Sequence, residues 1–327
     1  MSAPILDVEG LRKTYPVLRR ALLGARTEGE IRAVDDVSFA VDRGECLGLV
    51  GESGCGKTTT ARAMLHLVPP TAGRVRLDGV DIVPLLAGAD RAAALRVRRG
   101  IQYVFQDPYL SLNPRWSVGR TVMEPFRVHR HSPAAEWEER VAELLELVGL
   151  EAVHAGRFPH EFSGGQRQRV GIARALAVSP RVLICDEPVS SLDVSVRAQI
   201  LNLLVSLQDR LGLTYVYISH DLASVRFISN RVAVMYLGRI VELAETEALF
   251  EHPRHHYTHA LLQAIPVPDP GARVAEPLGG ELPSAMERPS GCAFRTRCPA
   301  AQARCAAEVP VLGAAGDGRL VACHYPR

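Results

Sequence analysis

The stretch GESGCGKTT, residues 51–59, has the residue types and spacing of a phosphate-binding loop. Its glycines let the backbone fold into a ring of N–H donors at the positive end of a helix. Lys57 adds a point charge for the β- and γ-phosphates, and the Thr58 hydroxyl can hold Mg²⁺. A glycine-rich turn that fits by chance is the alternative, but a strand pattern precedes the loop and a helix pattern follows it. The sequence therefore predicts a nucleoside triphosphate site.

Two adjacent carboxylates end the apolar run VLICDEP. Asp186, at the end of a strand, can hold Mg²⁺ through water, and Glu187 can polarise an attacking water as a general base. An acidic pair alone is most often solvated charge. With a phosphate loop about 130 residues upstream, a hydrolytic role becomes the better interpretation.

A second anion site is predicted in the stretch EFSGGQRQRVGIARAL. Ser163, Gly164 and Gly165 open a helical run, and a helix N-terminus presents free backbone N–H groups. A chain with one phosphate loop has no internal use for this site, so we infer that it serves the nucleotide of a partner subunit. Alternatively, these residues only cap a helix.

The elements that must position these residues follow from hydrophobic patterning. Buried strands are predicted from short apolar runs at residues 45–51, 181–188 and 213–221. Because they alternate with helical patterns, we expect an α/β fold with a mainly parallel sheet covered by helices. Alternating residues predict two more strands near the N-terminus, with an exposed loop over residues 16–30 between them.

Composition narrows the function classes. The chain has 327 residues, 47% of them hydrophobic and 23% charged, which is typical of a globular protein with one large core and a smaller appendage. A net charge of +2 argues against a nucleic-acid binder. There is no apolar run of about 20 residues and no signal peptide at the start, so we expect a reducing cytoplasmic setting where structural disulfides are rare.

Six motifs occur in the order seen in ATP-binding cassette (ABC) ATPases: GESGCGKTT, Gln106 in YVFQD, FSGGQ, VLICDEP, SSLD, and His220 in ISHD. The chain resembles this family over residues 4–266. Within it, FQDPYLSLNPRWSVGRTVMEP and EHPRHHYTHALLQAIP resemble the ATPases of oligopeptide/dipeptide importers, in particular the second of their two ATPase subunits. The ending GCAFRTRCPAA…CHYP resembles the C-terminal extension of the same group.

The resemblance implies an ABC-type nucleotide-binding domain. Such a domain has a RecA-like phosphate-loop core, an antiparallel β subdomain and a helical subdomain, here at about residues 107–162. A Pro/Gly-rich stretch predicts a linker at residues 267–290. A small cysteine-containing extension would follow at residues 291–327.

The resemblance also assigns roles to single residues. Tyr15 would stack on adenine, although an ordinary strand aromatic is an equal alternative. The catalytic residues would be Lys57, Gln106, Glu187 and His220. A histidine at a strand end is by itself more often structural. ATP would be bound, besides Tyr15, by Gly51, Glu52, Ser53, Gly54, Cys55, Gly56, Lys57, Thr58 and Thr59.

Further roles concern the metal ion and the dimer. Mg²⁺ would be held by Thr58, Gln106 and Asp186. The signature residues Ser163, Gly164, Gly165 and Gln166 would act on the ATP of a partner, and Asp193 in SSLD would couple the two sites. The implied partners are a second, homologous ATPase subunit, two transmembrane permease subunits and, indirectly, an extracytoplasmic solute-binding protein. The chain would be peripheral at the cytoplasmic face of the membrane.

Four of the seven cysteines lie in the extension: Cys292, Cys298, Cys305 and Cys323. Zinc ribbons generally use C-x2-C pairs, which this spacing lacks, while iron–sulfur ligand spacing is more permissive. The resemblance adds that some members of the group carry a [4Fe–4S] cluster here. We expect a cluster ahead of zinc or no metal. His324 is a possible substitute ligand, and Cys46 and Cys185 read as small core residues.

The function expected is therefore an ATPase that energises import of peptides. Alternatives are a cassette ATPase not tied to transport, for example in cluster assembly, an importer of nickel chelates or another small solute, and a module that binds ATP without turnover. Intact Glu187 and His220 argue against the last. The cargo is not encoded in this chain, because specificity resides in a binding protein and a permease.

Overall fold

The computed structural model describes residues 3–21, 24–130, 132–264, 283–284 and 286–327. The predicted linker at 267–290 lies mostly outside these residues. The chain divides into two compact units. Unit 1 comprises Met1–Leu6, Ala40–Cys46 and Arg76–Ser219; unit 2 comprises Asp7–Phe39, Leu47–Val75 and His220–Arg327. The two units are described separately.

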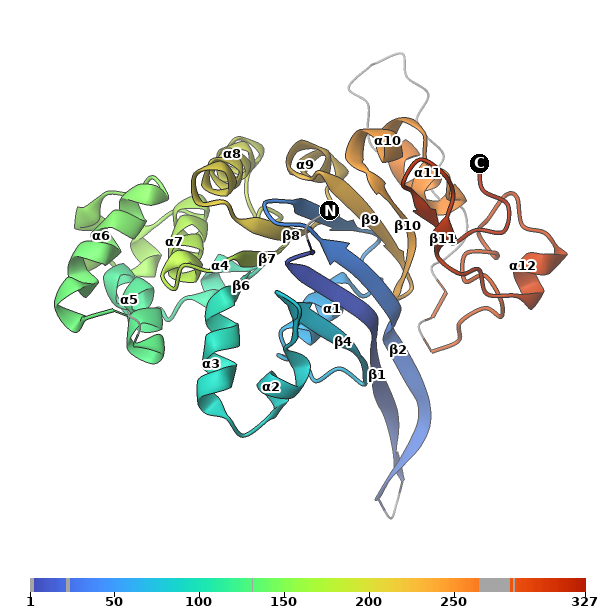
Figure 1. Cartoon of the computed structure of the whole chain (residues 1–327), viewed down its shortest axis with the longest axis horizontal. Coiled ribbons are helices and arrows are strands. Elements are labelled where there is room, and N and C mark those ends of the chain that lie inside the picture. The colour runs from blue at the N-terminus through green and yellow to red at the C-terminus, as the bar shows by residue number, and fades with distance from the viewer. Residues whose placement is uncertain (1–2, 22–23, 131, 265–282, 285) are drawn as a thin grey trace. The chain divides into compact units, whose positions relative to one another are not determined.

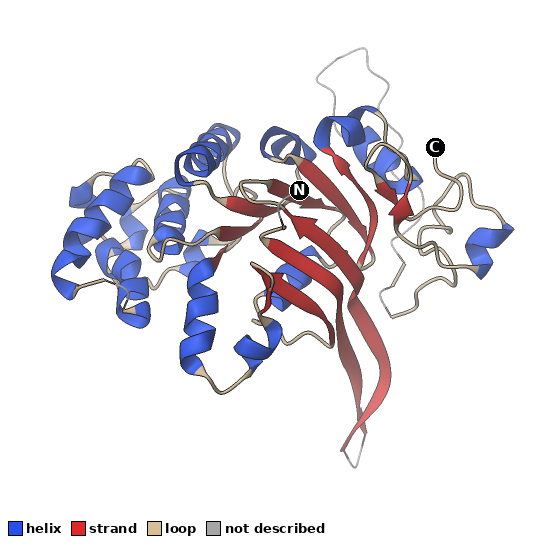
Figure 2. Cartoon of the chain, viewed as in Figure 1, coloured by secondary structure: helices blue, strands red, loops and turns tan. Residues whose placement is uncertain are grey.

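The strands, red in Figure 2, are β1 (Leu6–Ala21), β2 (Gly24–Val41), β3 (Cys46–Val50), β4 (Ala72–Leu77), β5 (Val80–Asp81), β6 (Ile101–Val104), β7 (Val182–Asp186), β8 (Thr214–Ile218), β9 (Arg231–Tyr236), β10 (Arg239–Glu245), β11 (Gly313–Ala314) and β12 (Leu320–Val321). The α-helices, blue in Figure 2, are α1 (Lys57–Met64), α2 (Val83–Ala87), α3 (Arg91–Gly100), α4 (Pro108–Ser111), α5 (Val118–His129), α6 (Trp137–Leu147), α7 (Gly164–Leu176), α8 (Val194–Leu211), α9 (Leu222–Ile228), α10 (Thr246–Glu251), α11 (His256–Gln263) and α12 (Ala303–Ala307).

Unit 1 has a parallel core of three strands. β7 pairs in parallel with β6 on one side and β8 on the other. Every residue of β7 and β8 is buried, as expected for strands covered on both faces. The predicted strands at 181–188 and 213–221 are confirmed, and so is the parallel arrangement. Their carboxyl ends carry Asp186 and the residues that follow Ile218.

The helices of unit 1 pack through apolar stripes. α5, α6 and α7 contact one another (Figure 1), with Phe126 of α5 stacked on Trp137 of α6 at 6.4 Å between ring centroids. Three α7 arginines reach back to earlier segments: Arg167 donates to Pro159 O, Arg169 to Val148 O and Arg174 to Ser111 O. These bonds join α7 to the chain that leads into it.

Unit 2 combines a parallel and an antiparallel part. β3 pairs in parallel with β9, and β9 pairs with β10 in antiparallel register. β12, near the C-terminus, adds to the other side of β10 through Glu242↔Val321 and Leu243↔Leu320, and β11 pairs with β12. The sequence did not predict the pairing of β10 with β12, because it joins segments about 80 residues apart.

The expected loop over residues 16–30 is wrong. β1 continues to Ala21 and β2 begins at Gly24, so strands cover most of that segment. Two strands that run on beside each other satisfy their backbone groups whatever the polarity of their side chains. The pairing of the two strands, and not the strand propensity of the individual residues, therefore determines the structure of this segment.

A buried carboxylate organises the start of α11 in unit 2. Glu242 of β10 has no exposed surface, and it accepts hydrogen bonds from the backbone N–H groups of Arg254 (2.8 Å) and His255 (2.9 Å). His255 Nδ1 in turn accepts from the Tyr257 N–H at 3.0 Å and so caps α11. The His255 ring packs on Phe294, with centroids 5.8 Å apart.

Burial lowers the pKa of His255 from 6.5 to about 3. The native state therefore holds this imidazole neutral, whereas the unfolded chain protonates it below about pH 6.5. We expect the free energy of unfolding to fall as the pH drops from about 6.5 towards 3, by about 1.4 kcal/mol per pH unit at most. Urea unfolding between about pH 5 and 7.5 measures this slope. His255→Asn keeps a capping acceptor and should flatten it; an equal slope in both proteins would contradict the assignment.

Candidate nucleotide site

The phosphate loop of unit 2 is confined by backbone on both sides. Gly51 has φ +152° and Gly56 has φ +108°, conformations that side chains rarely adopt. A Cβ at Gly51 would lie 2.2 Å from Met235 O, and one at Gly56 would lie 2.2 Å from Ala33 O. Glycine is therefore required twice, once for dihedral angle and once for space. The predicted order of strand, loop and helix is confirmed by β3 and α1.

Lys57 is held within the loop. Its ammonium donates to Gly51 O (2.7 Å), Glu52 O (3.1 Å) and Cys55 Sγ (3.7 Å). The contact with sulfur is the weakest of the three and is the one that a phosphate oxygen would replace most easily. Burial raises the pKa of the Cys55 thiol, which fits a small packed residue in the loop and not a reactive one.

Two other predicted residues belong to unit 2. Tyr15 is 37% exposed, and Lys13 Nζ lies 4.9 Å from the centroid of its ring. An exposed ring with a cation on one face has the chemistry for stacking on a base. His220 follows directly after unit 1 and is also exposed.

The carboxylates lie at the carboxyl end of β7 in unit 1. Asp186 is only 1% exposed and accepts a hydrogen bond from Tyr103 Oη of β6. Glu187 has φ +46°, and its N–H donates to Ile218 O at 2.8 Å. This left-handed turn directs the chain out of the strand directly after Asp186.

Gln106 and Glu187 are brought together, although 81 residues separate them. Gln106 Nε2 donates to Glu187 Oε2 at 2.9 Å. A carboxylate that accepts from an amide has its orientation fixed while it keeps other lone pairs for a water. This contact between two predicted catalytic residues is the most specific feature of unit 1.

The start of α7 is a capping box. Ser163 Oγ accepts from the Gln166 N–H at 3.3 Å, and Gln166 Oε1 accepts from the Ser163 N–H at 3.0 Å. Gly165 packs on α8: a Cβ there would lie 2.3 Å from Val196 Cγ1. Ser163 and Gln166 therefore do cap a helix, as the alternative interpretation held. This cap leaves the N–H groups at Gly164 and Gly165 outside the box. Asp193, at the N-cap of α8, is exposed and makes no side-chain cap.

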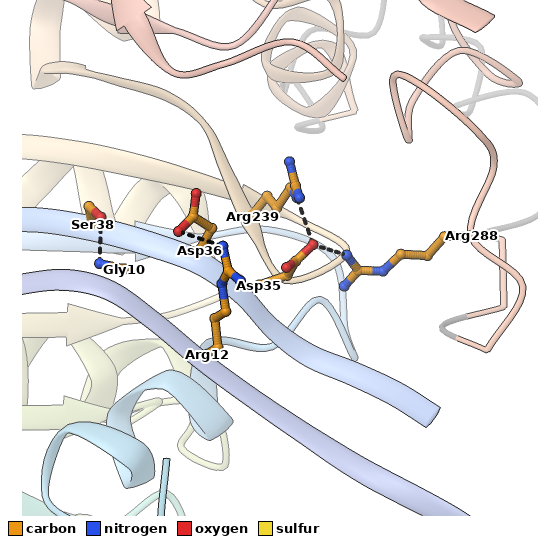
Figure 3. Close-up of polar contacts among 7 residues, drawn as sticks. All are labelled: Gly10, Arg12, Asp35, Asp36, Ser38, Arg239 and Arg288. Carbon is orange, nitrogen blue, oxygen red and sulfur yellow. Dashed lines mark hydrogen bonds and ion pairs between the residues drawn. The ribbon is translucent and has the colours of Figure 1, made fainter. Parts of the chain in front are cut away.

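The segment that leads into the extension is fastened to the rest of unit 2 through Arg288. Figure 3 shows Asp35 of β2 between two arginines. Its Oδ2 accepts from Arg239 Nε at 2.8 Å and from Arg288 Nη1 at 2.7 Å. Burial raises the pKa of Asp35, but the hydrogen bond and charge of Arg239 and the charge of Arg288 outweigh it and hold that pKa below its ordinary value. The carboxylate is therefore ionised and paired.

All four cysteines of the extension line one narrow cavity, together with His255, His256 and His324. Burial, followed by the charges of its neighbours, raises the pKa of Cys323 to about 11, and burial also raises the pKa values of Cys292 and Cys298. The cavity volume is about 10 Å³, room for about one water. Within the described part of the chain, no three Cys, His, Asp or Glu side chains are arranged to hold a metal ion. The four cysteines thus share one cavity, but in this arrangement they do not form a metal site, and the cavity has no room for a cluster.

Two contacts near the phosphate loop escaped prediction. Arg297 of the extension pairs with Glu52, and Tyr257 Oη accepts from the Glu52 N–H. Tyr103 was also missed as a partner of Asp186. Cys46 and Cys185 are fully buried core residues, as expected. No helix among the described residues combines the length and apolarity that crossing a membrane requires.

Two family profiles match the chain. Residues 34–190 match "ABC transporter", and residues 241–305 match "Oligopeptide/dipeptide transporter, C-terminal region". The second profile covers most of β10, all of α10 and α11, and three of the four cysteines of the extension.

Curated relatives match almost from end to end. A protein of Sinorhizobium fredii named probable peptide ABC transporter ATP-binding protein y4tS is 53% identical over 99% of this chain and 90% of its own length. The oligopeptide transport ATP-binding protein AppF of Bacillus subtilis is 48% identical over 98% of this chain and 97% of its own. A putative peptide import ATP-binding protein of Brucella ovis is 50% identical over 98% and 97%.

A solved structure supports the fold. A dimer of the ATP-binding cassette MJ0796 in a post-hydrolysis state with ADP and Pi aligns with a TM-score of 0.63 and 30% identity. The match covers 74% of this chain and 98% of that one. The α/β cassette fold is therefore confirmed. The alternative of a cassette ATPase unconnected to transport gains no support, because these three relatives are named as transport proteins.

Gly165→Ala should lower the free energy of unfolding by about 1–3 kcal/mol, because its methyl group meets Val196. Adding Val196→Ala should recover most of the loss. The matched control is Gly171→Ala on the same helix, where a Cβ meets nothing within 4 Å and helix propensity favours alanine. Denaturant unfolding of the four proteins tests the packing role; a Gly165→Ala protein as stable as the Gly171→Ala control would contradict it.

Proposed function

This chain belongs to the ABC transporter family, and we propose that it is the ATP-hydrolysing subunit of an importer of peptides or related small solutes. As a member of the family it is an ATPase, which converts ATP and water to ADP and phosphate. The peptide assignment is supported by the names of the relatives and by the match of residues 241–305. The observation that carries hydrolysis is the contact of Gln106 with Glu187.

Catalysis depends on charge placement and on one proton acceptor. The N–H groups of the loop from Gly51 to Thr59 bind the phosphates, and Lys57 offsets charge on the transferred group. Glu187 takes a proton from the attacking water, and the Gln106 amide holds its carboxylate in place. His220 would contact the γ-phosphate, and Tyr15 would stack on adenine.

The residues assigned to Mg²⁺ suit that ion by donor chemistry. Thr58, Gln106 and Asp186 offer hydroxyl, amide and carboxylate oxygens, which hard divalent cations prefer. Asp186 is buried and its carboxylate accepts a hydrogen bond from Tyr103, which fixes its orientation. When bound, the ion neutralises phosphate charge as it develops.

The partners of this chain are proposed from its membership of the ABC transporter family. Two ATPase subunits, most simply a heterodimer, would sandwich ATP between the phosphate loop of one and Ser163–Gln166 of the other. Asp193 would couple the two sites, and the helical segment at about 107–162 would dock on a permease loop. Two permease subunits and a solute-binding protein complete the importer, with this chain at the cytoplasmic face. The N–H groups of Gly164 and Gly165, which lie outside the capping box at the start of α7, support the signature role.

We also propose that Cys292, Cys298, Cys305 and Cys323 hold a [4Fe–4S] cluster, with zinc as the other metal to test. Convergence of all four on one cavity supports the proposal. Thiolates bind metal, so a metal must displace protons from thiols whose pKa values are raised. The role would be structural, folding an extension too small for a core of its own.

Glu187→Gln should leave ATP binding intact and lower the hydrolysis rate by about 10²–10⁴-fold, because the proton acceptor is lost. It should also trap the closed dimer with ATP. Nucleotide affinity, phosphate release and gel filtration of the full chain with its partner subunit measure the three effects. The control is Glu138→Gln, an exposed carboxylate of α6 in the same unit. Hydrolysis at the wild-type rate would remove Glu187 from the mechanism.

Protein purified without oxygen should contain about four irons and four sulfides per chain. Cys298→Ser should lose them, whereas Cys46→Ala should keep them because Cys46 lies in β3 outside the cavity. Elemental analysis and the visible spectrum give the result. Zinc alone would replace the cluster assignment, and metal-free wild-type protein would rule out both.

A further inference from the structure

One residue of the phosphate loop is held from three directions. The Glu52 N–H donates to Tyr257 Oη at 2.9 Å, and its carbonyl accepts from Lys57 Nζ at 3.1 Å. Its carboxylate accepts two bonds from Arg297, from Nη1 at 2.8 Å and from Nη2 at 2.9 Å. Tyr257 is in α11 and Arg297 is in the extension, so two C-terminal segments reach the loop at the same residue.

The pairing of Arg297 with Glu52 is of the strong kind. Both oxygens and both terminal nitrogens take part, in the fork-to-fork geometry that fixes orientation as well as distance. The Arg297 side chain is only 4% exposed, whereas that of Glu52 is 26% exposed. Loss of the guanidinium would leave a poorly solvated carboxylate without its counter-charge.

The segment that presents Arg297 is itself fixed. Phe294, three residues earlier, is buried against Tyr236 and Tyr257, with ring centroids 5.3 and 5.4 Å away. Arg297 lies 6.0 Å from the Tyr236 ring. Cys298, the next residue, lines the cysteine cavity. The guanidinium is therefore positioned by packing before it meets Glu52.

We propose that Arg297 is a positioning residue for nucleotide binding, which acts through Glu52 on the phosphate loop and on Lys57. It orients Glu52, whose carbonyl is a partner of the Lys57 ammonium. It also neutralises a carboxylate located in a loop that must receive a polyanion. Without that neutralisation, the negative charge of Glu52 repels the phosphates of ATP across a short distance. The proposal rests on the ATPase function above and adds that the extension sets nucleotide affinity.

Arg297→Ala should raise the dissociation constant for Mg-ATP of the full chain about fivefold to tenfold, a coupling of ordinary size between two sites. In the assembled transporter, KM for ATP should rise equally while kcat changes less than about twofold, because Glu187 and Gln106 are untouched. Adding Glu52→Gln removes the unpaired charge and should recover most of the affinity. A merely structural role for Arg297 would give no such recovery.

The matched control is the pair of Arg304 and Glu308, joined at 2.8 Å in the same extension and more than half exposed on both sides. Arg304→Ala should leave the affinity unchanged, since exposed pairs contribute little. An Arg297→Ala protein that binds ATP as tightly as this control, or that Glu52→Gln does not rescue, overturns the proposal. If neither wild type nor control binds ATP, the ATPase function fails instead.

Should Arg297→Ala not fold, Arg297→Lys replaces it in the comparison. Lysine keeps the charge but loses the fork, so only one of the two bonds can persist. A dissociation constant raised about threefold supports positioning by geometry. An unchanged constant overturns it.

Discussion

The conformation of the phosphate loop is constrained by two other stretches of backbone that pack directly against it. Met235 O closes one side at Gly51, and Ala33 O closes the other at Gly56. Hydrogen bonds continue the sequence of contacts: Gly238 N–H donates to Cys55 O at 2.7 Å, and Asp35 N–H donates to Gly238 O at 2.8 Å. Three segments remote in sequence thus share one tight junction. Everything that fixes β2 or the turn between β9 and β10 also fixes the loop.

The C-terminal extension and Arg288, just before it, contact this same junction. Arg288 pairs with Asp35, two residues from Ala33, and Arg297 pairs with Glu52 within the loop. Glu52 is held by the fork of Arg297, and Asp35 accepts one hydrogen bond each from Arg288 and Arg239. These groups are partly buried, so a lost partner is costly. A segment that looks like an appendage by composition therefore participates in shaping the nucleotide site. This view also explains why an arginine-rich, cysteine-bearing stretch is ordered despite having so few large apolar residues.

Local motifs were predictable because their chemistry is local. Lys57, Asp186 and Ser163 each sit at a strand or helix end that hydrophobic patterning reveals, and the structure has those ends where the sequence indicated. The contact of Gln106 with Glu187 could be expected only as a family property, since no spacing rule joins positions so far apart. Arg297 could not be found at all. Its partner is 245 residues away, and one arginine among many carries no signal until packing of Phe294 gives it a direction. The extension of β1 and β2 into residues 16–30 was missed for a related reason. It depends on the pairing of the two strands, which side-chain polarity does not reveal.

The position of β12 next to β10 predicts how truncation of the gene would affect the protein. β12 covers the side of β10 away from β9. Residues Ile240 to Ala244 of β10 are buried. A stop codon anywhere before Leu320 would remove this cover and expose the stretch of β10 around Glu242 and Leu243, which pairs with β12. Such an edge templates pairing with other chains. Nonsense alleles that stop before Leu320 but spare every motif of the nucleotide site would thus be expected to fail through aggregation.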